Sequence, residues 1–158
     1  MQSDFDALKA RISDMDKDEL KSFQGKNCLF CQITRHKLPS MPVYEDEKVL
    51  AILDIRPANK GHILLVPKEH YTILPQIGKE LLSHIFKITK KISQAIIYGL
   101  KADGTNIYVA SGQVAGQSSE HALVHIIPRF KHDDLNTFAL KQGDALETDL
   151  EKVRERLR

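Results

Sequence analysis

The segment from Gly116 to Arg129, GQSSEHALVHIIPR, concentrates the side chains of this chain that are best suited to chemistry. His121 and His125 stand four residues apart in a run typical of a β-strand, and strand side chains alternate between two faces. Leu123 therefore shares a face with both imidazoles. Because an imidazole exchanges protons near neutral pH, attacks electrophilic atoms or binds a metal, this face is the first candidate for a functional site.

Cys28 and Cys31 form a second candidate, since only two residues separate them. This spacing suits half of a metal site or a redox pair. A thioredoxin-like redox pair needs a helix that begins at its first cysteine, whereas we expect a loop after Cys28, so the metal interpretation is favoured. Zinc would take two further ligands from the histidines, among which spacing alone does not choose: His36, His62, His70, His84, His121, His125 and His132.

β-rich runs separated by turn-forming residues predict the sheet that must position these side chains. Runs over residues 43–44, 49–54 and 62–66 predict a three-stranded meander. Residues 105–110 and 121–128 predict two further strands, joined by a glycine-bearing loop. The sequence thus predicts five strands.

Apolar residues recur at steps of three and four from Gly78 to Leu100, which predicts one long helix across a face of the sheet. We therefore expect a single α+β domain over residues 1–158, with a mostly antiparallel five-stranded sheet. Its expected parts are an N-terminal helical arm over 1–25, a core over 27–132 and a C-terminal helical tail over 133–158.

Composition excludes several classes of protein. The chain of 158 residues is 42% apolar and 28% charged, with a net charge of +2 that is too small to indicate a nucleic-acid partner. Its basic residues are interleaved with acidic ones. The sequence has no apolar run of the roughly 20 residues that cross a bilayer, and its polar start does not resemble a signal peptide. These features predict a cytoplasmic protein with no membrane partner.

The histidine segment resembles the signature of the histidine triad (HIT) superfamily of nucleotide-binding proteins. That signature is His-x-His-x-His followed by two apolar residues, often after Gly-Gln-Ser and often before Pro-Arg. The resemblance covers roughly residues 27 to 132, and the matching residues of the signature are Gly116, Gln117, Ser118, His121, His125, Ile126, Ile127, Pro128 and Arg129.

Leu123 departs from the signature, because it stands where the family has its nucleophilic histidine. In the family, that histidine attacks the α-phosphorus of a nucleotide and forms a covalent histidine-nucleotidyl intermediate. A leucine side chain offers no lone pair. We therefore expect no covalent hydrolase or transferase chemistry through this position.

The resemblance also implies a structural zinc. Many bacterial and archaeal HIT proteins bind one zinc through a CxxC pair, a histidine after a Pro-Lys pair and the first histidine of the triad. These correspond to Cys28, Cys31, His70 and His121 here. A histidine that binds zinc must be neutral, so His121 would not act as an acid or base.

A nucleotide pocket is the third implication. The family pattern places Asp54 against the ribose hydroxyls and Ile55 against the base, while Gln117, Ser118 and His125 would contact the α-phosphate. The implied ligand is a purine nucleoside monophosphate or a dinucleotide-type molecule, and the implied assembly is a homodimer. A second departure is Ala110, which stands where the family commonly has an asparagine.

Other functions remain open from the sequence. His125 could activate water in a hydrolase that uses another nucleophile, or Leu123 could be an engineered change in an active enzyme. Ser118 or Ser119 beside His125 lacks a third group to orient the base, so a serine nucleophile is disfavoured. Alternatively, the chain is a protein-interaction scaffold whose pocket is vestigial.

Overall fold

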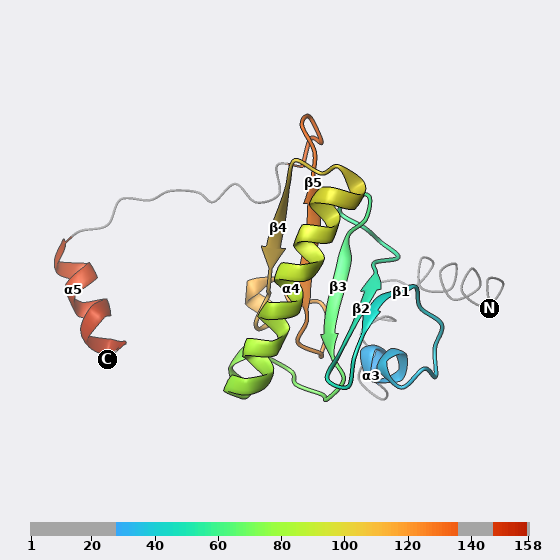
Figure 1. Ribbon diagram of the computed structural model, residues 1–158. Coiled ribbons are helices and arrows are strands. Elements are labelled where there is room, and N and C mark those ends of the chain that lie inside the picture. The colour runs from blue at the N-terminus through green and yellow to red at the C-terminus, as the bar shows by residue number, and fades with distance from the viewer. Residues whose placement is uncertain (1–27, 136–146, 158) are drawn as a thin grey trace.

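The computed structural model describes residues 28–135 and 147–157 (Figure 1). The predicted N-terminal arm lies outside these residues. The first part contains helix α3 (Leu29–Thr34), strands β1 (Pro42–Glu45), β2 (Val49–Leu53) and β3 (Ile63–Pro67), helix α4 (Lys79–Leu100), and strands β4 (Gly104–Tyr108) and β5 (Val124–Arg129). Short 3-10 turns cover Leu74–Gln76 and Gln113–Ala115, and helix α5 (Glu147–Arg156) occupies part of the predicted tail.

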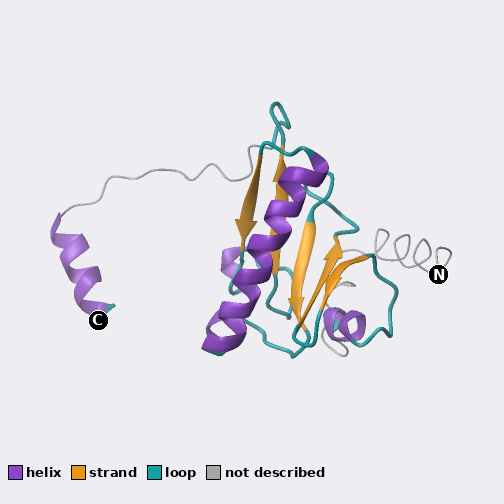
Figure 2. Ribbon diagram, viewed as in Figure 1, coloured by secondary structure: helices purple, strands orange, loops and turns teal. Residues whose placement is uncertain are grey.

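The five strands form one sheet in the order β1-β2-β3-β5-β4, and every neighbouring pair is antiparallel (Figure 2). β1 to β3 are the predicted meander. β5 then inserts between β3 and β4, with Leu64 opposite His125 and Ile107 opposite Ile126. The predicted α+β class with an antiparallel five-stranded sheet is confirmed.

Continuous apolar sequence makes β2 and β3 the buried centre of the sheet. Because side chains alternate, each strand supplies two cores. Val49, Ala51, Ile63 and Leu65 belong to the core beneath α4, whereas Leu50, Ile52, Leu64 and Val66 belong to the core beside α3. The sheet is thus covered on both faces.

Helix α4 lies across one face of the sheet, as predicted (Figure 1). Its buried positions recur at steps of three and four, which places them on a single stripe: Ile85, Ile88, Ile92 and Ile96. Each buried isoleucine contributes about 1.5–3 kcal/mol relative to an exposed one. The helix ends where Lys101 adopts a left-handed conformation, with φ of 57°.

Helix α3 corrects the expectation of a loop after Cys28, since a helix begins there instead. Leu29, Phe30 and Ile33 point into the core on the sheet face opposite α4. This burial, more than local propensity, explains a helix of six residues. Because α3 starts at the first cysteine, it brings Cys28 and Cys31 to neighbouring positions one turn apart.

Strand β5 begins at Val124, three residues later than predicted. The cause is Ser119, whose hydroxyl oxygen accepts a hydrogen bond from the backbone N–H of His121 (2.9 Å) and donates to the carbonyl of the same residue (3.0 Å). The His121 backbone is therefore diverted from the strand ladder. Alternation nevertheless continues through this stretch, with Ala122 and Val124 facing α4 and Leu123 facing the opposite core.

No helix within the described residues, 28–135 and 147–157, combines the length and the apolar character that a bilayer span requires.

Candidate functional site

Four potential metal ligands converge at one edge of the α3-side core. Cys28 and Cys31 come from the start of α3, His70 from the loop after β3, and His121 from the segment before β5. Cys31 Sγ is 3.2 Å from His70 Nδ1 and 3.6 Å from His121 Nδ1, and Cys28 Sγ is 3.4 Å from His121 Nδ1. Their ligand atoms all lie within 4.8 Å of one another, so the four side chains could hold one metal ion.

The hydrogen bonding of His121 suits a metal ligand. Its Nε2 lies 2.9 Å from the carbonyl oxygen of Pro67, which can only accept, so Nε2 carries the hydrogen. The lone pair is then on Nδ1, which faces both sulfurs. Burial lowers the pKa of His121 to about 4, and the neutral form is the one that binds metals. A backbone carbonyl behind a ligating histidine is a common means of fixing its orientation.

The cysteine pair has little of the character of a redox site. Reactive thiols have a lowered pKa, whereas burial, together with the neighbouring Cys28, raises the pKa of Cys31 to about 11. Both cysteines are free, and both lie against histidines. Two thiols and two imidazoles are the ligand set that structural zinc prefers, so the donor set fits this ion.

A cavity of about 410 Å³ adjoins the four-ligand cluster and shares His121 with it. The cavity is lined by all five side chains for which the sequence predicts nucleotide contacts: Asp54, Ile55, Gln117, Ser118 and His125. The structure therefore brings together residues from the end of β2, the loop before β5 and β5 itself.

Leu123 lines the same cavity and forms part of its apolar wall. Its side chain is 9% exposed and belongs to the core that contains Phe30, Ile33 and Leu64. Ala110 also lines the cavity and contributes no polar group. At Leu123 and at Ala110, two of the positions where the chain departs from the HIT pattern, the cavity is lined by aliphatic carbon.

His62 is a component of the site that sequence reasoning missed. Its Nε2 lies 3.0 Å from His125 Nδ1, and its ring is 4% exposed. The backbone N–H of Ala58 donates to His62 Nδ1 over 3.1 Å. An amide can only donate, so His62 holds its hydrogen on Nε2 and donates it to His125 Nδ1. His125 then carries its own hydrogen on Nε2, which makes that atom a hydrogen-bond donor.

Charge in this part of the site is low. Burial lowers the pKa of His62 to about 4, and burial with the nearby His62 does the same for His125. Asp54 Oδ2 lies 3.3 Å from His62 Nδ1, but the pair is not ionic at neutral pH because His62 is uncharged. Burial also raises the pKa of Asp54, whose Oδ1 accepts the backbone N–H of Arg56 at 2.8 Å. A neutral His125 that carries its hydrogen on Nε2 is poorly prepared to act as a base.

Gln117 and Ser118 differ in what they offer a ligand. The Gln117 amide nitrogen donates to the carbonyls of Thr72 and Ser119, each at 2.6 Å, and its oxygen accepts the N–H of Gly112 at 2.6 Å. Gln117 therefore holds the loop in shape, and its predicted phosphate contact stays a prediction. Ser118 makes no side-chain hydrogen bond to another described residue, so its hydroxyl is available.

The serine-nucleophile alternative gains no support from this geometry. Ser119 directs its hydroxyl to the His121 backbone, and neither Ser118 nor Ser119 forms a hydrogen bond with His125 among the described residues. A base in contact with the hydroxyl is what such a mechanism requires.

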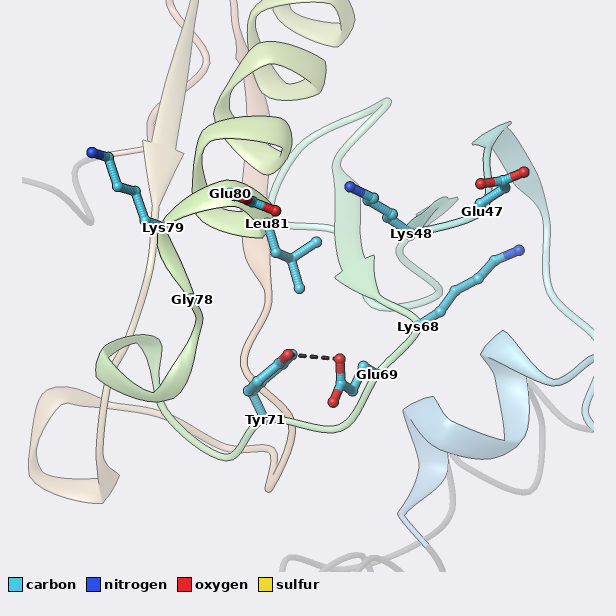
Figure 3. Close-up of a pocket in the computed structure, with 9 residues that line it drawn as sticks. All are labelled: Glu47, Lys48, Lys68, Glu69, Tyr71, Gly78, Lys79, Glu80 and Leu81. Carbon is cyan, nitrogen blue, oxygen red and sulfur yellow. Dashed lines mark hydrogen bonds between the residues drawn. The ribbon is translucent and has the colours of Figure 1, made fainter.

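A larger cleft of about 560 Å³ lies on the α4 side of the sheet, where Tyr71 donates to Glu69 at 2.7 Å (Figure 3). Its charged lining consists of three lysines and three glutamates, so neither sign dominates: Lys48, Lys68, Lys79, Glu47, Glu69 and Glu80. None of the lining residues is a histidine or a cysteine. The smaller cavity is the better candidate, because it alone combines an apolar wall with convergent polar groups.

Comparison with known proteins identifies the class. A family profile described as the HIT domain matches residues 35–132. The chain is 44% identical over 135 residues to an uncharacterized HIT-like protein of Borreliella burgdorferi, covering 82% of this chain and 92% of the relative. It is 32% identical over 126 residues to adenosine 5′-monophosphoramidase HNT1 of Saccharomyces cerevisiae, covering 80% and 75% of the two chains.

A solved structure agrees with these relatives. The crystal structure of a Zn-bound histidine triad family protein from Mycobacterium smegmatis has a TM-score of 0.67 and 34% identity to this protein, covering 84% of this chain and 94% of that chain. The chain therefore belongs to the HIT domain family, and the resemblance predicted from its histidine segment is confirmed.

Proposed function

We propose that this protein binds a purine nucleotide, as a nucleoside monophosphate or a dinucleotide-type ligand, without the covalent mechanism of its family. The observation that carries the proposal is Leu123 in the wall of a cavity that His125 also lines. His125 is held there by its hydrogen bond with His62. The name of the yeast relative, an adenosine 5′-monophosphoramidase, supports a nucleotide as the class of ligand.

Each predicted contact follows from the chemistry of its side chain. The Asp54 carboxylate accepts hydrogen bonds from ribose hydroxyls, and Ile55 offers an apolar surface to a base. The Nε2–H of His125 and the hydroxyl of Ser118 donate to phosphate oxygens. Because Leu123 has no lone pair, none of these contacts leads to a nucleotidyl intermediate.

A structural zinc is the second part of the proposal. Cys28, Cys31, His70 and His121 would hold it, and the Zn-bound relative from Mycobacterium smegmatis supports the identity of the ion. With four protein ligands, the site would leave no open position for water, so a bound zinc would act as a cross-link and not as a catalyst. The four residues thereby tie α3 and the loop after β3 to the segment that leads into the cavity.

A homodimer and a cytoplasmic location stay predictions. Support for the homodimer comes from α4 and from β4, an edge strand, which together expose several large apolar side chains: Phe86, Ile97, Tyr98, Leu100 and Ile107. Exposed apolar patches of this kind commonly mark interfaces.

Two measurements on the zinc-loaded chain test the proposal. Titration calorimetry with adenosine and guanosine monophosphates should show saturable binding that weakens in Asp54→Ala. Incubation with adenosine 5′-phosphoramidate or a dinucleoside polyphosphate should release no monophosphate, and mass spectrometry should find no adduct. Absence of binding would favour the scaffold alternative. Turnover that disappears in His125→Ala, without an adduct, would favour a hydrolase that uses activated water.

A further inference from the structure

The cavity offers no excess of positive charge to an anionic ligand. Among the described residues, four ionisable side chains line it: Asp54, Arg56, His121 and His125. His121 donates from Nε2 to the Pro67 carbonyl and turns Nδ1 toward the two cysteine sulfurs. His125 Nδ1 accepts the hydrogen of His62 Nε2, so neither ring is arranged to add a positive charge. Arg56 is exposed, and its charge is close enough to stabilise the carboxylate of Asp54. One positive and one negative side chain therefore balance each other.

The wall around Leu123 is apolar. Leu123 and Ala110 are each 9% exposed, and Leu29, Phe30 and Leu64 complete this side of the cavity. A 5′-phosphate carries nearly two negative charges at neutral pH. Moving such a group from water against aliphatic side chains is unfavourable unless donors replace the lost hydration. From the loop before β5 and from β5 itself, the side-chain donors that line the cavity without a hydrogen bond to the backbone are the Nε2–H of His125 and the Ser118 hydroxyl.

For an uncharged 5′ group, the gain from burial exceeds the loss of hydration. A hydroxyl or thioether at this position loses little hydration, and it gains from burial against the aliphatic wall. The ribose hydroxyls of a nucleoside would still reach Asp54, and the base would still lie against Ile55.

We propose that the cavity prefers a purine nucleoside with an uncharged 5′ group to the matching 5′-monophosphate, and that Leu123 is the residue that sets this preference. This inference rests on the purine and ribose contacts of the proposed function, and it changes the preferred 5′ group from a phosphate to an uncharged one. The protein is then a nucleoside-binding member of its family, in which an apolar contact replaces the reactive histidine.

Titration calorimetry on the full zinc-loaded chain tests the preference. The probes are adenosine, 5′-deoxy-5′-methylthioadenosine and adenosine monophosphate, at pH 7.5 and constant ionic strength. Both uncharged nucleosides should bind with a Kd at least about tenfold lower than that of the monophosphate. Monophosphate binding as tight as or tighter than adenosine would overturn the preference and leave nucleotide binding intact. Absence of binding by all three probes would overturn the proposed function itself.

Variants test the role of Leu123. Leu123→His adds a ring donor to the wall and should shift the ratio of the two Kd values about tenfold toward the monophosphate, whereas the matched apolar change Leu123→Met should leave the ratio unchanged. Zinc content and melting temperature report whether each variant folds. If Leu123→His does not fold, Leu123→Gln adds a donor at the same position and serves instead. A ratio that does not change in the folded donor variant overturns the role assigned to Leu123.

Discussion

The four-ligand cluster and the cavity both include residues of the segment before β5. They differ in how closely their residues match the HIT pattern. The segment contributes His121 to a cluster of two thiols and two imidazoles, whose side chains come from three separate parts of the chain and face one another. Two residues further on, Leu123 packs among aliphatic side chains where the HIT pattern has its nucleophile. The four-ligand cluster connects α3 to the segment before β5, so its loss would weaken the fold, whereas a leucine in the cavity adds burial. Within a few residues of one segment, the chain thus combines a potential metal ligand that matches the HIT pattern with a buried leucine that departs from it.

Removal of a proposed zinc ligand should have the largest effect. We expect His121→Ala to lose zinc and to lower the free energy of unfolding by more than about 3 kcal/mol, because metal binding and folding are coupled. Metal analysis and chemical denaturation measure both quantities. His84→Gln is the matched control, since His84 lies on α4 and contacts Asp46 at 2.7 Å. One zinc retained in His121→Ala, with unchanged stability, would show that His121 is not one of the residues that hold the ion.

Introduction of histidine at position 123 should have the next largest effect. Leu123→His places a polar ring in the apolar wall, where at least one nitrogen lacks a partner, and we expect a loss of about 1–3 kcal/mol. Leu123→Met should cost less than about 1.5 kcal/mol, because its volume and polarity are similar. Thermal and denaturant unfolding of both variants check the difference. A more stable Leu123→His would indicate that the cavity retains a polar environment suited to histidine.

Acid should weaken the fold through the His62–His125 pair. The pKa of each is about 4 in the folded protein and about 6.5 when unfolded, so the unfolded chain binds more protons between these values. The free energy of unfolding should therefore decrease as the pH falls from about 6.5 toward 4. Denaturant unfolding at a series of pH values measures this slope.

The variant His62→Gln distinguishes the contribution of the His62–His125 pair to this pH dependence from that of the four proposed zinc ligands, which also bind protons in acid. The variant removes one titrating group and leaves the four-ligand cluster unchanged, so its slope should be shallower. Equal slopes in the native chain and His62→Gln would mean that the pair does not contribute.

Substitution in the larger cleft should have the smallest effect. Lys79 lines that cleft and lies outside the cavity near Leu123 (Figure 3). We expect Lys79→Ala to change stability by no more than about 0.5 kcal/mol and to leave nucleoside affinity within about twofold. Calorimetry compares the variant with the native chain. A large loss of affinity would instead place the ligand in the larger cleft.

Local patterns predicted most of the sheet and the long helix. The apolar runs of β2 and β3 and the isoleucine stripe of α4 identify their elements, because burial on a sheet or a helix imposes a period on the sequence. Helix α3 escaped prediction, since six residues carry too short a pattern and tertiary packing of Phe30 and Ile33 stabilises it.

The site was only partly predictable for a related reason. Family signatures mark Cys28, His70 and His121 in the sequence, and these residues do come together. His62 carried no such mark. Its contact with His125 depends on the pairing of β3 with β5, which are far apart in the chain. The hydrogen bond from the Gln117 amide nitrogen to the carbonyl of Thr72 likewise depends on tertiary structure.

The Ala58 amide has a consequence for which atoms the cavity accepts. Because the amide nitrogen can only donate, it fixes which nitrogen carries the hydrogen in His62 and then in His125. His125 Nε2 therefore carries a hydrogen, and a ligand atom beside it must offer a lone pair to accept it. A ligand that presents an oxygen or a sulfur there is complementary, whereas one that presents an ammonium group meets hydrogen against hydrogen. One backbone N–H outside the cavity wall thus determines which functional groups are admitted inside it.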